Sequence, residues 1–304
     1  MRKVNFIGGL PRSGSTLLTN ILLQNPKFQT TATSSLLEFL LQVRDNWTKL
    51  EGHSTYPDGQ DKWKVIRAIL ENYHNTDKEV IFDKNRGWST HIEFMEKVSG
   101  KKAKIIACVR NLEDICTSFE KLFRKNRADG EIHGEFSNPQ MKNLDGRVGV
   151  WTSDEGVLGR PYVSLLDTIN RGLGDRILFF PYEEWTADPN YWFTQLYNFI
   201  EEPYFQHNFE NIEQIIREND AGYGWGADLH EIKTGKLIPA KSDALKVLGK
   251  GWYEKLHDTE FWKNIQNNQP KRNEFQAQPS LNEVQYNQPV NFTKQFESNY
   301  SKYR

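Results

Sequence analysis

Apolar residues along the chain gather in short runs typical of buried strands, separated by longer stretches with helical spacing. Four strand-like runs are visible, at residues 4–9, 78–84, 103–110 and 176–183. After each run, apolar residues recur every three or four positions, as on one face of a helix. Strands and helices that alternate in this way favour a parallel sheet with right-handed crossovers. We therefore predict an α/β fold with a central parallel sheet flanked by helices.

The same pattern predicts where the main helices and connections lie. Helices are expected to begin near residues 15, 34 and 111 and to cover 61–74, 160–171 and 189–200. Residues 30–33 are interpreted as a Thr-rich connection and residues 128–147 as a long polar loop. Ser35-x-x-Glu38 and Thr90-x-x-Glu93 have the spacing of capping boxes, in which the two side chains close a helix N-terminus.

The pattern changes near residue 262. Residues 1–262 carry the alternation and are predicted to form one domain. From residue 263 the chain is rich in Asn and Gln, and no core-forming period is visible. We expect residues 263–304 to form an extended polar C-terminal tail that packs on the domain or on a partner.

The candidate chemistry begins in the first strand–loop–helix unit, residues 4–23. The run from Gly9 to Thr16 follows the pattern G-x-x-x-x-G-K-[ST], except that Ser15 stands in place of the lysine. A helix that starts there directs unpaired N–H groups and the positive end of its dipole at the loop, an arrangement that binds phosphate. The cation in this loop is Arg12, whose guanidinium can hold an oxyanion with two hydrogen bonds. The unit predicts a P-loop-like domain for a nucleotide with a short anionic 5′ end.

Charged residues also end two later strands. Lys84 ends the second strand-like run and Arg110 the third. Open α/β sheets bind ligands at the carboxyl ends of their strands. Ser118 follows Arg110 by two helical turns, so both are predicted to reach one anion. Residues 222–236 combine glycines, aromatics and lysines and are a candidate active-site loop. The loop contains one histidine, His230, and a histidine by itself is more often structural than catalytic, so we interpret it as structural.

The bulk composition narrows the function classes. The 39 basic and 40 acidic residues balance, so no global field attracts nucleic acid or an anionic membrane. The two cysteines, Cys108 and Cys116, fit neither a disulfide framework nor a metal cluster, which indicates a reducing compartment. We see no signal peptide and no apolar run of membrane-spanning length. We expect a cytoplasmic protein with no metal, no nucleic-acid partner and no membrane span.

Over residues 3–240 the chain resembles the sulfotransferase family, enzymes that use 3′-phosphoadenylyl sulfate (PAPS). The loop Pro11–Thr16 resembles the family's 5′-phosphosulfate loop, most closely its Pro-Arg-Ser-Gly-Thr-Thr form in tyrosylprotein and related bacterial sulfotransferases. Arg110 with Ser118 resembles the 3′-phosphate site, and Lys84 resembles the lysine that contacts the transferring sulfuryl group. Tyr182 resembles the tyrosine of the family's Tyr-Glu signature, which lies near the adenine.

The resemblance implies a set of site residues and a reaction. The expected cofactor-binding residues are Arg12, Ser13, Gly14, Ser15, Thr16, Arg110, Ser118, Tyr182 and, by a loose alignment with a late phosphate-binding loop, Lys233. The expected catalytic residues are Lys84, Arg12 and Glu38. The implied reaction is in-line transfer of a sulfuryl group from PAPS to a hydroxyl or amine, without a metal, leaving adenosine 3′,5′-bisphosphate (PAP).

The catalytic base departs from the family's patterns. Cytosolic members use a histidine two residues after the lysine, where this chain has Arg86. Tyrosylprotein members use a glutamate after the loop, and here the corresponding position is Thr33, with Glu38 the nearest carboxylate beyond it. Glu38, Asp83 and His91 stay open as candidates.

Two other functions and the partners also stay open. A P-loop kinase or NTPase would need a lysine at position 15 and a Mg²⁺-holding aspartate, which Asp83 could supply. A nucleotide-binding module without catalysis is the other alternative. The acceptor is expected to be a small molecule, saccharide or peptide, since one scaffold serves many acceptors, and a homodimer is compatible with the sequence.

Overall fold

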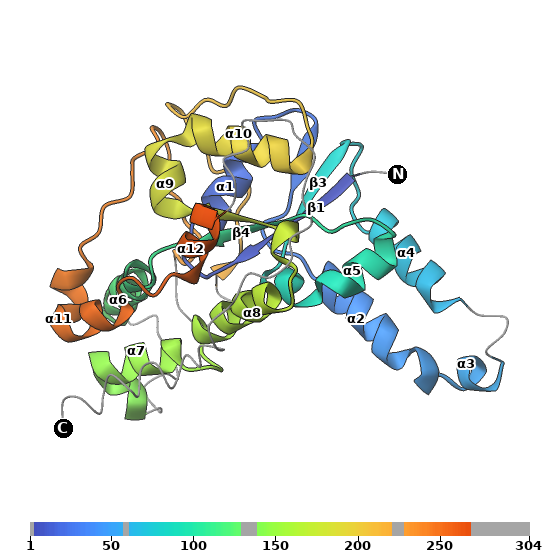
Figure 1. Ribbon diagram of the computed structural model, residues 1–304, viewed down its shortest axis with the longest axis horizontal. Helices are drawn as coiled ribbons and strands as arrows, with labels where there is room; N and C mark the ends of the chain where they lie inside the picture. Colours follow the sequence, from blue (N-terminus) through green and yellow to red (C-terminus); the bar gives the residue numbers. More distant parts are fainter. Residues whose placement is uncertain (1–2, 57–60, 129–138, 221–227, 269–304) are drawn as a thin grey trace.

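A five-stranded sheet forms the centre of the molecule (Figure 1). The computed structural model describes residues 3–56, 61–128, 139–220 and 228–268. Within them the strands are β1 (Lys3–Gly9), β2 (Phe28–Thr30), β3 (Val80–Lys84), β4 (Ile105–Val109) and β5 (Ile177–Pro181). Their order is β2-β3-β1-β4-β5, and every neighbouring pair is parallel. The predicted α/β fold with a parallel sheet is confirmed.

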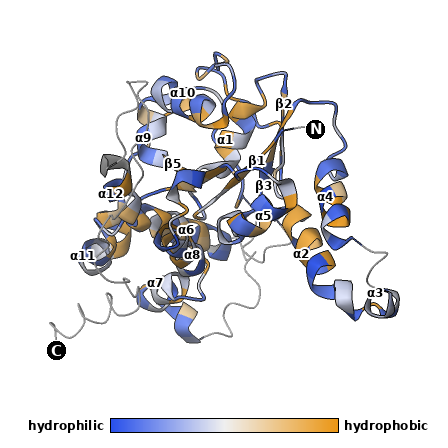
Figure 2. Ribbon diagram, turned by 45° about the vertical axis from the view of Figure 1, so that its right-hand side comes forward, coloured by the Kyte–Doolittle hydropathy of each residue, from blue (hydrophilic) through white to orange (hydrophobic). Residues whose placement is uncertain are grey.

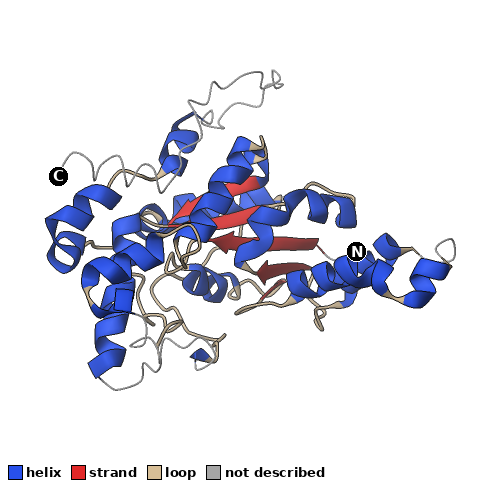
Figure 3. Ribbon diagram, turned by 90° about the horizontal axis from the view of Figure 1, so that it is seen from below, coloured by secondary structure: helices blue, strands red, loops and turns tan. Residues whose placement is uncertain are grey.

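Helices connect the strands and cover both faces of the sheet (Figure 3). The α-helices are α1 (Ser15–Leu22), α2 (Leu36–Asn46), α3 (Glu51–Thr55), α4 (Lys62–Asn72), α5 (Ile92–Ser99), α6 (Leu112–Ala128), α7 (Leu144–Thr152), α8 (Gly159–Asn170), α9 (Tyr182–Ala187), α10 (Pro189–Ile200), α11 (Ala244–Leu256) and α12 (Phe261–Asn268). Short 3₁₀ helices are η1 (Trp47–Lys49), η3 (Arg86–His91), η5 (Pro139–Lys142) and η6 (Gly174–Arg176).

The sheet is buried on both sides, and its side chains alternate between two cores. In β4, Ile105 and Ala107 belong to one hydrophobic cluster, whereas Ile106 and Cys108 belong to the other. Hydrophobic residues concentrate on the strands and on one side of surface helices such as α2 and α4 (Figure 2). A doubly covered parallel sheet explains why the strands read as continuous apolar runs in the sequence.

Strand β2 was not expected and takes in the first residue, Thr30, of the expected Thr-rich connection; residues 31–33 are neither strand nor helix. Phe28, Gln29 and Thr30 pair in register with Val80 to Phe82 of β3. A strand of three residues is too short to show a period of two, so its partner strand, rather than its own pattern, defines it.

Both predicted capping boxes are wrong. Ser35 precedes α2, but its side chain caps nothing; Ser34 Oγ accepts the Leu36 N–H at 3.1 Å instead. Helix α5 begins after His91, again without a side-chain cap, and Thr90 instead meets the hydroxyl of Ser164. Glu38 binds Asn85 and Glu93 binds Arg171, and partners from such distant positions are beyond a local spacing rule.

Two other helix starts follow the sequence. The Asp61 carboxylate accepts the backbone N–H of Lys64 at 3.0 Å at the start of α4. Asp188 accepts the N–H of Tyr191 at 3.2 Å at the start of α10.

The C-terminal part of the described chain is helical. Helix α12 crosses the predicted boundary at residue 262, and Trp262 is 1% exposed in the core. The remainder of the predicted tail, from residue 269, lies outside the described residues, as does 129–138 of the predicted polar loop; residues 139–147 of that loop enter η5 and α7. No helix in the described ranges is long and apolar enough to cross a membrane.

Candidate functional site

A cavity of about 670 Å³ lies at the carboxyl ends of the central strands. The loop after β1, the end of β3, the junction of β4 with α6 and residues 229–241 all contribute to its wall. Every predicted cofactor-binding residue lines it, namely Arg12, Ser13, Gly14, Ser15, Thr16, Arg110, Ser118, Tyr182 and Lys233. Lys84 lines it as well, whereas Glu38 does not.

The loop after β1 is held in a fixed shape. Ser13 Oγ lies 2.5 Å from the Leu10 carbonyl oxygen and 2.9 Å from that of Cys108, so it ties the loop to β4. Gly14 has φ 82°, a conformation that glycine adopts without strain. A Cβ there would lie 2.4 Å from the Tyr182 ring, so the close contact with this ring also requires glycine. The loop therefore presents the N-terminus of α1 to the cavity.

The Arg12 guanidinium joins three parts of the wall. Its Nε donates to Ser118 Oγ at 3.0 Å, and its Nη1 donates to the Leu229 carbonyl. Burial, and secondarily the nearby Arg110, lowers the pKa of Arg12 to about 10. The side chain stays charged at neutral pH, in a position where a bound anion would relieve the repulsion.

Arg110 lies beside this group at the start of α6. Its Nη1 donates to the Arg12 carbonyl at 3.1 Å, and its guanidinium lies 4.8 Å over the Tyr182 ring. Glu183 Oε1 is 3.7 Å from Arg110 Nε, but burial raises the pKa of Glu183 to about 7. Arg110 is therefore only partly neutralised at neutral pH. The structure brings the predicted residues Arg12, Arg110 and Ser118 together.

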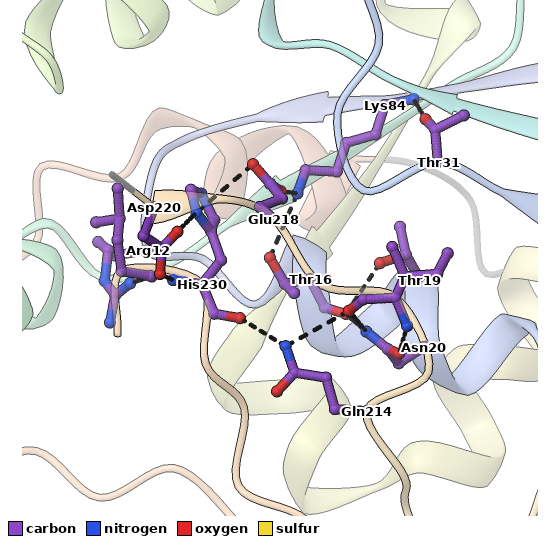
Figure 4. Close-up of polar contacts among 12 residues, drawn as sticks. Arg12, Thr16, Thr19, Asn20, Thr31, Lys84, Gln214, Glu218, Asp220 and His230 are labelled. Carbon is purple, nitrogen blue, oxygen red and sulfur yellow. Dashed lines mark hydrogen bonds and ion pairs between the residues drawn. The ribbon is translucent and has the colours of Figure 1, made fainter. Parts of the chain in front are cut away.

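Lys84 extends from the end of β3 to the first turn of α1. Its Nζ lies 2.6 Å from Glu218 Oε1 and 3.3 Å from Thr16 Oγ1 (Figure 4). The Lys84 side chain is 13% exposed and that of Glu218 is 3% exposed. Burial lowers the pKa of Lys84, and the Glu218 carboxylate acts in the opposite direction. This buried ion pair places a second cation next to the loop.

The sequence offered no signal for Glu218 or for the residues beside it. Glu218 lies in a connection without strand, helix or motif, and reaches the cavity because α1 holds that connection. The Asn20 side-chain oxygen accepts the backbone N–H groups of Ile215 and Ile216 at 2.7 and 2.9 Å. Gln214 Nε2 then donates to the His230 carbonyl at 3.1 Å, which joins the two loop segments (Figure 4).

His230 completes this side of the wall. Its Nδ1 lies 2.7 Å from Asp220 Oδ1 and 3.5 Å from Glu218 Oε2. Burial lowers the pKa of His230, while the two carboxylates act to raise it. The histidine interpreted from sequence as structural thus lies at the cavity.

The three base candidates do not line the cavity. Glu38 is exposed, and its carboxylate accepts from Asn85 Nδ2 at 2.9 and 3.1 Å. His91 is half-buried at the start of α5, where burial lowers its pKa. Neither side chain is part of the cavity lining.

Asp83 is engaged in a buried network on the other side of β3. Its carboxylate accepts from Ser34 Oγ at 2.6 Å and from Trp88 Nε1 at 2.9 Å. His74 Nε2 lies 2.9 Å from the same carboxylate, and Asp83 is fully buried. These contacts give Asp83 a structural role.

The cavity lining carries more basic than acidic side chains. The basic residues are Arg12, Lys84, Arg86, Arg110, Lys121, Lys233, Lys236 and Lys241, and the acidic ones are Asp114, Glu218, Glu231 and Asp243. Such an excess in a concave site favours anionic ligands. Among the residues that the structure describes, no group of three or more His, Cys, Asp or Glu side chains is arranged to hold a metal ion.

The comparison with family models gives one match. A sequence model of the sulfotransferase family matches residues 5–206. Similar solved structures include the sulfotransferase domain from the curacin biosynthetic pathway, 18% identical over 78% of this chain and 84% of that one, with a TM-score of 0.42. The sulfotransferase domain from the Synechococcus PCC 7002 olefin synthase is 15% identical over 83% and 96%, with a TM-score of 0.43. A sulfotransferase from Alicyclobacillus acidocaldarius is 14% identical over 72% and 87%, with a TM-score of 0.41.

A search of curated proteins returns no match. The family match covers well over half of the chain and contains the loop after β1, Lys84, Arg110 and Tyr182. The protein therefore belongs to the sulfotransferase family.

Proposed function

We propose that the protein transfers a sulfuryl group from PAPS to a hydroxyl or amine of an acceptor. The observation that supports this proposal is the gathering of Arg12, Lys84 and Arg110 in one cavity, which we infer to form two anion sites. Arg12 and Lys84 flank the N-terminus of α1, and Arg110 with Ser118 lies at the start of α6. PAPS has two anionic groups to match, the 5′-phosphosulfate and the 3′-phosphate. ATP has no 3′-phosphate and would leave the second site empty.

The residues present fit this donor. Arg110 Nε is buried, and within the described residues it has no hydrogen-bond partner. A phosphate oxygen would supply one, and charge-assisted hydrogen bonds from guanidinium to phosphate are among the stronger ones in proteins. The 3′-phosphate is therefore proposed to bind Arg110 and Ser118, with Tyr182 near the adenine and Lys233 at the phosphates.

The chain's own contribution to the chemistry is positioning and charge stabilisation. A bond forms between the acceptor atom and sulfur while the bond from sulfur to the 5′-phosphate oxygen breaks. Arg12, Lys84 and the amides at the start of α1 are placed to stabilise the charge that develops on that oxygen. PAPS supplies the activated sulfuryl group, so no covalent intermediate on the protein is needed.

A kinase or NTPase needs a phosphate-binding lysine and a Mg²⁺-binding aspartate, and neither is available here. Ser15 occupies the place of the phosphate-binding lysine, and Asp83 is occupied by His74, Ser34 and Trp88 behind β3. The acceptor class (small molecule, saccharide or peptide) belongs to the proposal. So does a cytoplasmic location, in keeping with the free, buried Cys108 and Cys116.

Calorimetry with PAP, 5′-AMP and ATP, with and without Mg²⁺, tests the proposal. We expect metal-independent binding in which PAP binds more tightly than 5′-AMP, because only PAP reaches Arg110. Arg110→Ala should weaken PAP binding by about 10- to 100-fold, the scale of a hydrogen bond to a charged group, and leave 5′-AMP binding unchanged. Arg124→Ala, on the exposed side of α6, is the matched control. Equal affinity for PAP and 5′-AMP, or a preference for Mg²⁺-ATP, would contradict the proposal.

A further inference from the structure

His230 lies between the two cations assigned to the sulfuryl group. The residue before it, Leu229, accepts a hydrogen bond from Arg12 through its carbonyl. On the other side, the His230 ring faces Glu218, the ion-pair partner of Lys84 (Figure 4). A group that takes a proton from the acceptor has to lie within reach of the reacting atoms. His230 lines the cavity next to both cations.

The contacts of His230 define its tautomer. Asp220 binds this residue twice, because Oδ1 lies 2.7 Å from Nδ1 and Oδ2 accepts the backbone N–H at 3.2 Å. Since a carboxylate only accepts hydrogen bonds, Nδ1 carries the proton. In the neutral ring the lone pair is then on Nε2, on the side of the ring away from the carboxylates.

Burial favours the neutral form of the His230 ring. Burial is the largest influence and lowers the pKa of His230 below its usual 6.5. Asp220 and Glu218 act to raise this pKa, and Lys84 adds to the lowering. In a neutral histidine with its proton on Nδ1, Nε2 is the basic nitrogen.

The other acidic or basic candidates are engaged or distant. Glu38, Asp83 and His91 do not line the cavity. Four carboxylates do: Glu218 is held by Lys84, Asp114 accepts from Ser242 Oγ at 2.6 Å, Asp243 pairs with Lys121 at 2.6 Å, and Glu231 is exposed to solvent. Among the described residues, His230 is the histidine that lines the cavity.

We propose that His230 is the general base of sulfuryl transfer and that Asp220 is its positioning residue. Nε2 removes the proton from the acceptor hydroxyl or amine as the new bond to sulfur forms and the bond to the 5′-phosphate oxygen breaks. The proton stays on His230, and the electron pair leaves with PAP; the imidazolium then loses its proton to solvent. This inference rests on the proposed function.

The test compares His230→Gln and Asp220→Asn with a matched control. His257→Gln removes a histidine whose Nδ1 contacts a carboxylate, Glu113, at 2.8 Å, outside the cavity. The readouts are PAP formation from radiolabelled PAPS, with a panel of simple alcohols, phenols and amines and with water alone, and PAP binding by calorimetry. We expect His230→Gln to lower turnover by roughly 10²- to 10⁴-fold, the usual contribution of a general base. PAP affinity should stay unchanged, and His257→Gln should behave as the wild type.

The pH profile and the tautomer separate a base from a structural residue. Wild-type kcat should fall as the pH drops through the pKa of His230, and His230→Gln should lack this limb. In ¹⁵N NMR spectra of the wild type at neutral pH, His230 should be neutral with its proton on Nδ1, and Asp220→Asn should alter this tautomer and reduce kcat more than it changes KM. A positively charged His230 at neutral pH would overturn the inference, whatever the acceptor.

The two proposals can fail separately. If wild-type protein binds PAP and consumes PAPS while His230→Gln keeps full turnover, the base assignment is wrong and the proposed function stands. If wild-type protein does not bind PAP, the proposed function itself fails.

Discussion

At the scale of single residues, the site keeps cations in places where burial opposes their charge. The pKa of Lys84 is lowered mainly by burial, and its ion pair with Glu218 partly restores it. A buried ammonium without such a partner would lose its proton at a lower pH. Glu218 therefore opposes the loss of the Lys84 proton that burial favours.

Glu218→Gln should reveal this dependence. Without the carboxylate, the pKa of Lys84 should fall further, so the alkaline limb of kcat/KM for PAPS should move to lower pH. Because kcat/KM reports groups of the free enzyme, its pH profile is the measurement to make. Glu79→Gln, which removes the partner of the exposed Lys27, should leave the profile unchanged. An alkaline limb that stays in place or moves upward would contradict this role of Glu218.

At the scale of elements, helix α6 connects the site to the core. It begins beside Arg110 and carries Ser118, and two residues after Ser118 the Glu120 side chain is fully buried. Arg147 of α7 donates to both Glu120 oxygens at 2.8 and 2.7 Å and lies 4.3 Å over the Phe123 ring. This buried pair anchors α6 against α7.

Arg147→Ala should therefore destabilise the fold. We expect a loss of about 3 kcal/mol in the free energy of unfolding, at the low end for a broken buried pair, since Arg124 still reaches one Glu120 oxygen. Arg124→Ala should cost less than about 1 kcal/mol, because the Arg124 side chain is 57% exposed. Urea denaturation measures both, and equal losses would show that burial does not set the strength of these pairs.

At the scale of the whole molecule, part of the cavity wall comes from a segment that does not belong to the sheet. Residues 228–241 contribute His230, Lys233 and other lining residues, yet they contain neither helix nor strand. A single antiparallel bridge, between Ile212 and Gly235, is described for this part of the chain. Segments with few backbone hydrogen bonds open easily, and ligand contacts add to their stability.

PAP should consequently slow amide hydrogen exchange in residues 228–241 as well as in the loop after β1. Helix α8, on the far side of the sheet from α1, serves as the internal control and should keep its exchange rates. Hydrogen exchange with mass spectrometry resolves these segments. Protection confined to the loop after β1 would exclude residues 228–241 from the nucleotide site.

The sequence alone determined the features that arise from neighbouring residues. The turn after β1 depends on Gly14 and Arg12, the start of α10 on Asp188, and the strands on contiguous apolar runs. Because parallel strands end at the same edge of the sheet, Lys84 and Arg110 were also expected at the site before any contact was known. Local backbone geometry and strand direction are properties that a stretch of sequence carries by itself.

Only the tertiary structure decided which side chains meet across the chain. Glu38 has the spacing of a capping box but binds Asn85, and β2 exists because β3 lies beside it. Glu218 reaches Lys84, 134 positions away, because Asn20 of α1 holds the neighbouring backbone. Such partners depend on how distant segments pack. That packing brings His230 to the cavity wall and leaves Glu38 outside the lining.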